Sequence, residues 1–263
     1  MPAIGLAMTP KPAMLLVVPT LRDWLSSAPF TLAMSSGFFG FFAHTGVMTV
    51  LEDEGLVPSR VCGSSAGALV TGLWASGVPA RGIRDELLRL RREHFWDVRP
   101  GLGLLRGARF RALLESAIAV RTFDRCRVPL AVSVFDLGAR RTTVLREGEL
   151  APALHASCAA PIMFQPVRIG RRLYLDGGIL DRPGLAGVDG AERVLFHHLT
   201  SPPPWRRRND AGPRAPERPL MQVVAVSGVP SLNPFQLQRG GEAIERAAQG
   251  MRQALSRPAP DPT

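Results

Sequence analysis

A serine between two glycines has the residue types and spacing of a catalytic nucleophile. Residues 63–67 read Gly-Ser-Ser-Ala-Gly, so Gly63 and Gly67 flank Ser65 in a G-x-S-x-G pattern. A short apolar strand precedes the pattern and a helix-like run follows it. A serine on such a turn holds its hydroxyl above the sheet, and the first N–H groups of the helix stabilise negative charge that develops there. A tight, glycine-lined turn explains the same residues, so the rest of the chain must supply a base and an oxyanion hole.

Asp176 is the best-placed candidate for the base. A serine hydroxyl near neutral pH needs a base within hydrogen-bond distance. Asp176 ends the strand-like segment 172–175, and Gly177 and Gly178 after it leave its carboxylate unobstructed. The same Asp-Gly pair is typical of a hairpin turn, which is the structural alternative. Asp136 also ends a strand, but the residues after it read as an ordinary hairpin turn.

Two adjacent histidines offer a rival base. His197 and His198 lie in an apolar strand pattern downstream of Asp176. Together they give the chain order Ser, Asp, His that is found in α/β-hydrolases. The residues alone therefore leave two assignments open, a direct Ser–Asp pair and a Ser–His–Asp triad.

A glycine- and phenylalanine-rich turn is the candidate oxyanion hole. Gly37, Phe38, Phe39 and Gly40 lie between a predicted strand and a predicted helix, shortly before the serine motif. An oxyanion hole needs main-chain N–H groups aimed at the developing charge. A turn in this place naturally presents such groups.

Composition narrows the function classes. The 263-residue chain has a net charge of +10, carried almost wholly by arginine, so it favours anionic partners. Nucleic acid is not expected, because no nucleic-acid-binding motif is present and aromatic residues make up only 6%. An anionic membrane surface fits better, and the arginine-rich residues 205–218 are the expected point of peripheral contact. No apolar run approaches the roughly 20 residues of a membrane-spanning helix.

The cysteines indicate neither a metal site nor a disulfide framework. The 3 cysteines lie far apart, without C-x-x-C or a histidine spacing that suits zinc. Their odd number and scatter fit a reducing compartment. We therefore expect a cytoplasmic protein that uses no metal and no organic cofactor. The net charge adds the expectation of peripheral contact with a membrane.

Strands alternate with helices along the chain, which predicts an α/β fold with a mainly parallel sheet and helices on both faces. We expect an N-terminal extension over residues 1–29, a catalytic domain over 30–256 and a disordered tail over 257–263. A proline- and arginine-rich surface loop is expected over 202–219. Strands are predicted at 30–35, 57–63, 128–135, 142–146, 172–175, 193–199 and 221–227. Helices are predicted at 21–25, 42–54, 66–76, 79–96, 108–119, 149–157 and 240–255.

The ordered set of motifs resembles the patatin-like phospholipase family. The resemblance spans about residues 30–185 and includes Ala43-His44-Thr45-Gly46 after the turn, and residues 156–167 before the aspartate. It implies a three-layer α/β/α sandwich and a Ser–Asp dyad without histidine. Carried over, Ser65 is the nucleophile, Asp176 is the general base, and the N–H groups of the turn hold the oxyanion. His44 is then a structural residue.

The turn departs from the usual family pattern G-G-G-x-R-G. Ser35 stands at the first glycine position, and the turn has no arginine. Its Gly-Phe-x-Gly pattern resembles the adiponutrin-type branch, although one extra residue precedes His44. The hypothesis is a serine lipid acyl hydrolase of phospholipase A or acylglycerol lipase type, with an acyl-enzyme on Ser65. A Ser–His–Asp esterase and a non-catalytic lipid-binding or scaffolding relative are the alternatives.

Overall fold

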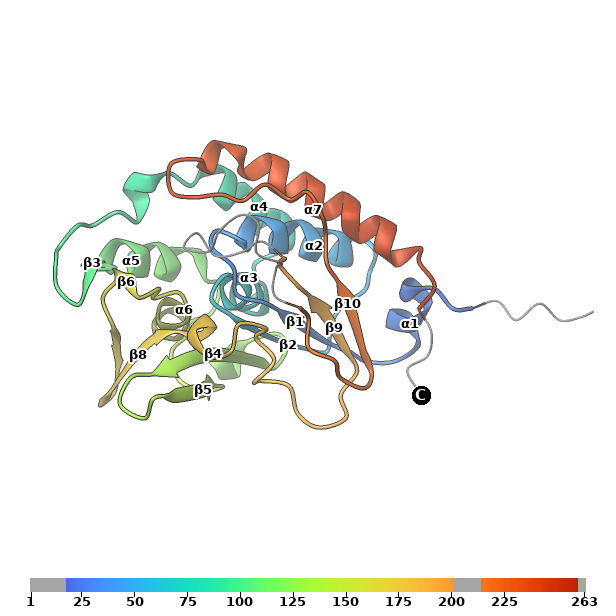
Figure 1. Ribbon diagram of the computed structural model, residues 1–263, viewed down its shortest axis with the longest axis horizontal. Coiled ribbons are helices and arrows are strands. Elements are labelled where there is room, and N and C mark those ends of the chain that lie inside the picture. The colour runs from blue at the N-terminus through green and yellow to red at the C-terminus, as the bar shows by residue number, and fades with distance from the viewer. Residues whose placement is uncertain (1–17, 201–213, 260–263) are drawn as a thin grey trace, which may run out of the picture.

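The computed structural model describes residues 18–200 and 214–259 (Figure 1). The N-terminal residues 1–17 and most of the predicted arginine-rich loop, including residues 205–213, lie outside the described residues. The last four residues of the predicted tail, 260–263, also lie outside them.

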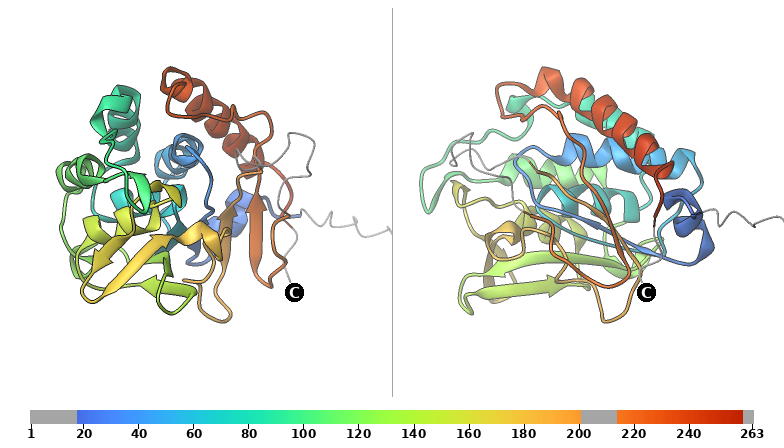
Figure 2. Two further views of the ribbon diagram at one scale, coloured as in Figure 1. Left: turned by 60° about the vertical axis from the view of Figure 1, so that its left-hand side comes forward. Right: turned by 45° about the vertical axis from the view of Figure 1, so that its right-hand side comes forward.

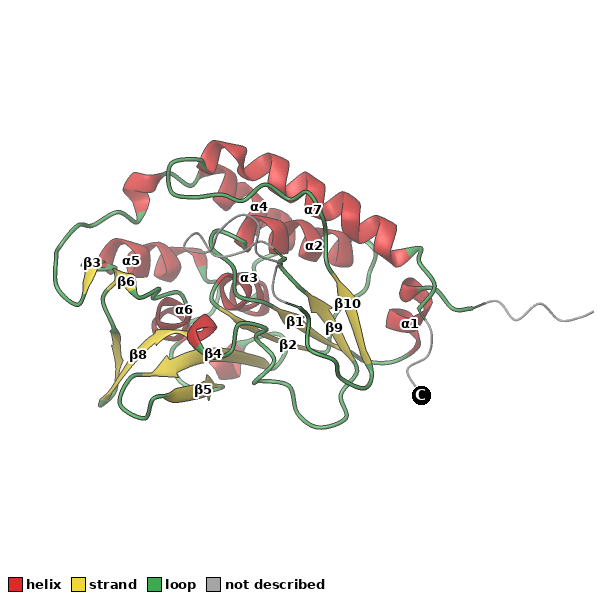
Figure 3. Ribbon diagram, in the orientation of Figure 1, coloured by secondary structure: helices red, strands yellow, loops and turns green. Residues whose placement is uncertain are grey.

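Strands and helices alternate along most of the described chain (Figure 3). The strands are β1 (Thr31–Met34), β2 (Arg60–Ser64), β3 (Gly103–Leu105), β4 (Leu130–Asp136), β5 (Arg141–Leu145), β6 (Ile162–Phe164), β7 (Val167–Ile169), β8 (Arg172–Asp176), β9 (Val194–His197) and β10 (Met221–Val224). The helices are α1 (Leu21–Ser27), α2 (Phe41–Asp53), α3 (Ala66–Ala75), α4 (Ala80–Arg89), α5 (Ala108–Ala117), α6 (Leu150–Ser157) and α7 (Gly240–Leu255).

The central sheet has the strand order β10-β9-β1-β2-β4-β8-β7, and β5 also pairs with β4. The five strands from β10 to β4 are parallel, whereas β5 and β8 run antiparallel to β4. The central strand β4 is a near-continuous apolar run and is almost wholly buried, as expected for a strand covered on both faces. The predicted fold class, α/β with a mainly parallel sheet, is confirmed.

Strands β2 and β8 lie end to end along one edge of β4. Pairing with β2 covers β4 up to Ser133, and pairing with β8 begins at Val134. On the side of β2, the Pro129 carbonyl accepts a hydrogen bond from the Val61 N–H. On the side of β8, the Leu137 N–H donates to the Leu173 carbonyl. Main-chain groups of successive residues in a strand point to opposite edges, so the two odd-numbered positions 129 and 137 face the same edge. The carboxyl ends of β2 and β8 therefore point toward each other.

The large helices gather on one face of the sheet (Figure 2), where α2 lies between the sheet and α7. The second face carries a small apolar cluster of Ala33, Cys62, Ala131, Val194 and Phe196. In the described part of the chain, β5 and the segment around residues 185–188 cover this cluster, not a helix. The small side chains of Ala131 and Cys62 allow the extended chain to pack closely here, since a Cβ on Gly187 would lie 2.6 Å from Ala131 Cβ and 3.2 Å from Cys62 Cβ.

Both ends of the described chain pack against each other. Thr20 caps α1 through a capping box, and Trp24 of that helix is buried. Thr20 also forms a β-bridge with Pro258, and Ala259 is buried. The tail predicted as disordered thus begins with packed residues, because main-chain hydrogen bonds to residues 19–21 hold them. The division of the chain at residues 29 and 256 stays a prediction.

The predicted helix over 79–96 is too long. Helix α4 ends at Arg89, because Leu90 takes an extended conformation. The chain then makes a short 3₁₀ turn, and Phe95 packs beside Phe39 with ring centroids 6.2 Å apart. Within the described residues, every helix is too short or too polar to cross a membrane.

Candidate active site

Ser65 lies on a strained turn between β2 and α3. Its φ of 52° and ψ of −118° fall in a region that non-glycine residues rarely adopt. Such a conformation costs about 1–3 kcal/mol and persists only where the surroundings enforce it. A Cβ on Gly67 would lie 2.1 Å from the Met34 carbonyl oxygen, and one on Gly63 would lie 2.5 Å from the Gly67 carbonyl carbon. The two motif glycines therefore allow the close approach of main chains that holds Ser65 in this conformation.

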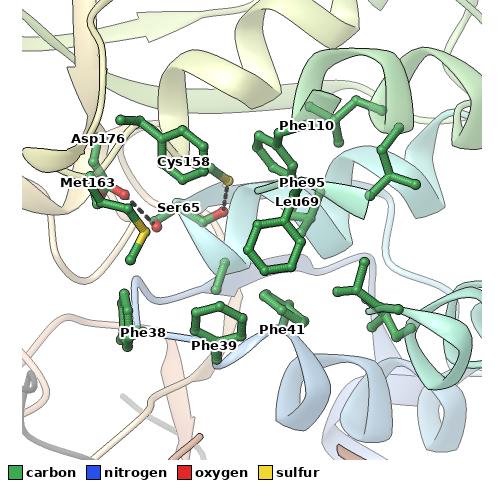
Figure 4. A pocket seen from close by; sticks show the side chains of 18 of the residues that line it. Phe38, Phe39, Phe41, Ser65, Leu69, Phe95, Phe110, Cys158, Met163 and Asp176 are labelled. Atoms are coloured by element: carbon green, nitrogen blue, oxygen red, sulfur yellow. Dashed lines mark hydrogen bonds between the residues drawn. The ribbon is translucent and has the colours of Figure 1, made fainter. Parts of the chain in front are cut away.

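The hydroxyl of Ser65 meets the carboxylate of Asp176 (Figure 4). Ser65 Oγ donates to Asp176 Oδ2 at 2.7 Å, and the Gly178 N–H donates to Asp176 Oδ1 at 2.7 Å. The contact follows from the strand geometry, because the carboxyl ends of β2 and β8 face each other and place Ser65 next to Asp176. No third residue stands between the hydroxyl and the carboxylate.

The Asp176 carboxyl group is buried, with only 6% of the residue exposed. Burial raises the pKa of Asp176 to about 6, against the opposing effect of the hydrogen bonds from Ser65 and Gly178. A carboxylate surrounded by protein rather than water holds its proton more strongly. Its basicity is thereby closer to the range in which a group can accept a proton at neutral pH.

The glycines after Asp176 serve close packing rather than a hairpin. A Cβ on Gly177 would lie 2.2 Å from the Ser133 carbonyl oxygen, and one on Gly178 would lie 2.3 Å from Ser36 Oγ. Asp176 caps the 3₁₀ turn Gly177–Ile179 through its bond to the Gly178 N–H. The hairpin alternative for Asp-Gly is wrong, because a 3₁₀ turn follows Asp176. The tight contacts explain why both positions are glycine.

The carboxyl end of α6 also holds the main chain of Ser65. The Ser65 N–H donates to Ser157 Oγ at 2.9 Å, and Ser157 Oγ donates to the Ser133 carbonyl at 2.7 Å. Cys158 Sγ lies 3.3 Å from the Ser65 carbonyl oxygen. Sequence reasoning assigned no role to Ser157, although it lies in the segment 156–167 that carried part of the resemblance.

The turn after β1 offers three unused N–H groups to the site. Among the described residues, the N–H groups of Gly37, Phe38 and Phe39 have no hydrogen-bond acceptor. The Gly40 N–H is different, because it donates to the Gly37 carbonyl at 2.9 Å. The prediction that the Gly40 N–H helps to form the oxyanion hole is therefore corrected, because this N–H is already engaged. The lack of a side chain at Gly40 instead allows close packing, since a Cβ would lie 2.1 Å from Leu199 Cδ1.

The histidines of the rival assignment are paired elsewhere. His44 Nδ1 and His197 Nδ1 lie 2.7 Å apart, and His44 Nε2 lies 2.8 Å from the Ser35 carbonyl. Burial lowers the pKa of His44 to about 4 and also lowers the pKa of His197, so both rings are neutral. His44 Nε2 then donates to Ser35 and its Nδ1 accepts from His197. Neither His197 nor His198 lines the cavity into which Ser65 opens.

A cavity of about 1040 Å³ extends from Ser65 and Asp176. Its volume is at the upper end of the range for small-molecule sites. Apolar side chains dominate its wall and come from the turn, α3, α4, α5 and β6, as Figure 4 illustrates for Phe38, Phe39, Phe41, Leu69 and Phe110. Phe42, by contrast, is fully buried in the core. Of the four phenylalanines in residues 38–42, Phe38, Phe39 and Phe41 thus line the cavity, and Phe42 supports the fold.

Ser65, which is half-buried, is hydrogen-bonded to the buried carboxylate of Asp176, and both residues line an apolar cavity beside a mainly parallel α/β sheet. The family model described as patatin-like phospholipase matches residues 32–188. The chain therefore belongs to the patatin-like phospholipase family.

Two relatives of known sequence are similar to parts of this chain. An uncharacterised NTE family protein of Mycobacterium tuberculosis is 30% identical over 184 residues, which cover 66% of this chain and 50% of the relative. The triacylglycerol lipase ptl3 of Schizosaccharomyces pombe is 35% identical over 74 residues, covering 28% of this chain and 14% of the lipase. This chain spans about half the length of the NTE family relative.

Among solved structures, VipD from Legionella pneumophila superposes with a TM-score of 0.64 at 16% identity. The alignment covers 86% of this chain and 66% of VipD. At this level of identity the likeness shows a shared fold.

Proposed function

We propose that this chain is a serine lipid acyl hydrolase, of phospholipase A or acylglycerol lipase type, with a Ser65–Asp176 dyad. The observation that carries the proposal is the 2.7 Å hydrogen bond from Ser65 Oγ to a buried carboxylate with a pKa of about 6. Membership of the patatin-like phospholipase family supports a lipid ester as the substrate. The apolar cavity beside the pair supports the same class, because it can take up an acyl chain away from water.

In the first half-reaction, Asp176 Oδ2 takes the proton from Ser65 Oγ as that oxygen attacks the ester carbonyl carbon. The carbonyl oxygen becomes an oxyanion, which the N–H groups of Gly37, Phe38 and Phe39 stabilise. The tetrahedral intermediate collapses, the carbon–oxygen bond to the alcohol breaks, and Asp176 returns its proton to the leaving oxygen. The acyl group is then bonded to Ser65.

In the second half-reaction, a water molecule takes the place of the alcohol. Asp176 accepts a proton from this water as its oxygen attacks the acyl carbon. The second tetrahedral intermediate breaks the bond to Ser65 Oγ, which regains the proton from Asp176. The products are a free fatty acid and the original enzyme, without a metal or an organic cofactor in the cycle.

A fluorophosphonate probe and a soluble ester test the proposal. We expect the native chain to label covalently and Ser65→Ala to lose both labelling and hydrolysis. Ser64→Ala is the matched control, because Ser64 Oγ is buried without a hydrogen-bond partner among the described residues. A folded native chain that neither labels nor hydrolyses esters would refute the proposal and favour a non-catalytic lipid-binding relative.

The histidine alternative is tested by replacing His197 and His198 together. The Ser–Asp proposal expects the folded double variant to keep its labelling, whereas a Ser–His–Asp triad requires that labelling be lost. Because His197 is bonded to His44 in the core, a thermal unfolding curve must accompany the assay. Labelling is compared only below the unfolding transition of the variant.

A further inference from the structure

A short hairpin over residues 97–106 projects at one end of the molecule, where the chain passes from α4 to α5 (Figure 1). The Arg99 N–H donates to the Leu104 carbonyl at 2.9 Å, and the Arg106 N–H donates to the Asp97 carbonyl at 3.0 Å. Leu102 occupies the tip and is 78% exposed. Leu104 is exposed as well, so the hairpin presents apolar side chains to solvent.

The hairpin is joined directly to the mouth of the cavity. Strand β3 of the hairpin pairs with β6, with Gly103 opposite Ile162. Ile162 lines the cavity and is nevertheless 85% exposed, and Ile179 lines it from the side of Asp176. We call Leu102, Leu104, Ile162 and Ile179 the apolar rim.

Folding does not account for the isoleucine in this rim. Ile162 has a φ of 70°, a conformation that is strongly unfavourable for a β-branched residue. Its side chain gains little from burial because most of it remains in water. Neither the main chain nor the core therefore favours isoleucine at this position, so its benefit must come from contact outside the folded chain.

Two exposed arginines lie in the same hairpin as Leu102 and Leu104. Arg99 and Arg106 belong to the hairpin and are exposed, and neither forms an ion pair with another described residue. The one acidic group of the hairpin, Asp97, is occupied by main-chain N–H groups of Gly107 and Arg109. Apolar tips flanked by arginine are suited to the interface of an anionic bilayer, where the tips enter the acyl boundary and the cations meet phosphate groups.

We infer that the apolar rim docks on an anionic phospholipid bilayer, so that the cavity of Ser65 opens onto the membrane. Leu102, Leu104 and Ile162 enter the interface, and Arg99 and Arg106 contact the phosphate groups. The inference rests on the proposed function only in one respect, namely that a lipid ester passes from the membrane into the cavity of Ser65. Docking itself is a binding property that can be measured without hydrolysis.

The experiment uses the full chain carrying Ser65→Ala, so that vesicles stay intact. Co-sedimentation with vesicles of phosphatidylglycerol and phosphatidylcholine measures affinity. We expect Leu102→Asp/Leu104→Asp to weaken binding at least tenfold. Val57→Asp is the matched control, because Val57 is 60% exposed on the loop before β2, away from the carboxyl end of that strand. This control is expected to bind as tightly as the parent.

The arginines are tested by Arg99→Gln/Arg106→Gln at several salt concentrations. We expect at least a tenfold loss of affinity and a weaker dependence on salt, because screening then has fewer charges to act on. Arg121→Gln/Arg252→Gln removes the same charge from exposed positions elsewhere and is expected to change affinity by less than threefold.

Ile162→Gly separates docking from folding. Glycine tolerates the positive φ, so we expect an unchanged or higher Tm together with weaker vesicle binding. A purely structural role for Ile162 would lower the Tm and leave binding unchanged.

Three outcomes would overturn the inference. They are a parent chain that does not bind the vesicles, rim variants that bind as tightly as the parent, or self-association through the rim that vesicles do not compete with, seen by light scattering. Vesicle binding by a native chain that fails to hydrolyse a soluble ester would instead refute the proposed function and leave the docking intact.

Discussion

Asp176 is the position where activity and stability should conflict most clearly. Its carboxyl group must be charged to accept the proton of Ser65, yet burial disfavours that charge. Asp176→Asn removes the charge and keeps the shape. The amide can also keep both hydrogen bonds, because its oxygen can accept from the Gly178 N–H and its nitrogen can donate to Ser65 Oγ. The variant thus isolates the effect of the charge.

The raised pKa sets the size of the effect on stability. The pKa of Asp176 is about 6 in the folded chain and 3.8 for an unperturbed aspartate. Each pKa unit corresponds to 1.36 kcal/mol, so ionisation of Asp176 lowers the free energy of unfolding by about 3 kcal/mol at pH 8. Because the pKa of Asp176 is higher in the folded chain than in the unfolded chain, the full free energy of unfolding is kept below pH 3.8, where the carboxyl group is protonated in both states. About 3 kcal/mol of it is lost as the pH rises through 6. At pH 5 the loss is about 1.6 kcal/mol.

Urea unfolding of the native chain and Asp176→Asn at pH 5 and pH 8 measures this difference. We expect the variant to be the more stable protein at both pH values, by an amount that roughly doubles between them. Its turnover of a soluble ester should fall by about 10²–10⁴-fold, the usual contribution of a general base. The reasoning is refuted if the variant is less stable at pH 8, if the stability difference does not change with pH, or if turnover falls less than tenfold.

Three further predictions test the same site. The kcat/KM of the native chain should rise with pH along a limb with an apparent pKa of about 6, set by ionisation of Asp176; a limb that stays flat from pH 5 to 8 would contradict this. Ser157→Ala should cost about 1–3 kcal/mol in urea unfolding and slow the labelling of Ser65, because it leaves the Ser65 N–H without its acceptor; unchanged stability and labelling would show that the contact is dispensable. Gly67→Ala should destabilise by about 1–3 kcal/mol or more, since its Cβ would lie 2.1 Å from a main-chain oxygen. Its control, Gly82→Ala in α4, meets only ordinary contacts and should stabilise by about 0.5–1 kcal/mol; equal effects of the two alanines would refute the packing argument.

Local patterns predicted the long elements of the fold well. The helix expected over 240–255 has these bounds in the structure, because its apolar positions recur at helical spacing along its whole length. The three-residue strands β3, β6 and β7 were missed. Each depends on a partner brought from elsewhere in the chain, as in the pairing of Gly103 with Ile162, and so short a segment has no periodicity of its own.

The candidate site was predictable in its residue types but not in its geometry. Ser65 and Asp176 were singled out because each follows a strand, and the structure brings their oxygen atoms to 2.7 Å. The sheet expected from the sequence was mainly parallel, with the strands predicted before Ser65 and before Asp176 among its members. Strand β8 instead runs antiparallel and meets β2 end to end on β4, an arrangement that depends on the long-range register and that a single sequence does not reveal. The engaged N–H of Gly40 likewise follows from how its turn closes.

The carboxyl end of α6 links the two halves of the proposed dyad. Ser157 fixes the main chain of Ser65, and the carbonyl of Ala159, two residues later, accepts from the Asp176 N–H at 3.0 Å. Cys158 between them is half-buried, and its thiol pKa is raised well above the ordinary value by burial and by the nearby Asp176 charge. One segment therefore orients the candidate nucleophile and also excludes water from the candidate base. Because the basicity of Asp176 comes from burial, any shift of this segment that admits water would lower the pKa of the base while it also releases the serine. Direct proton transfer to a carboxylate, without an imidazole between, depends on keeping these two properties together.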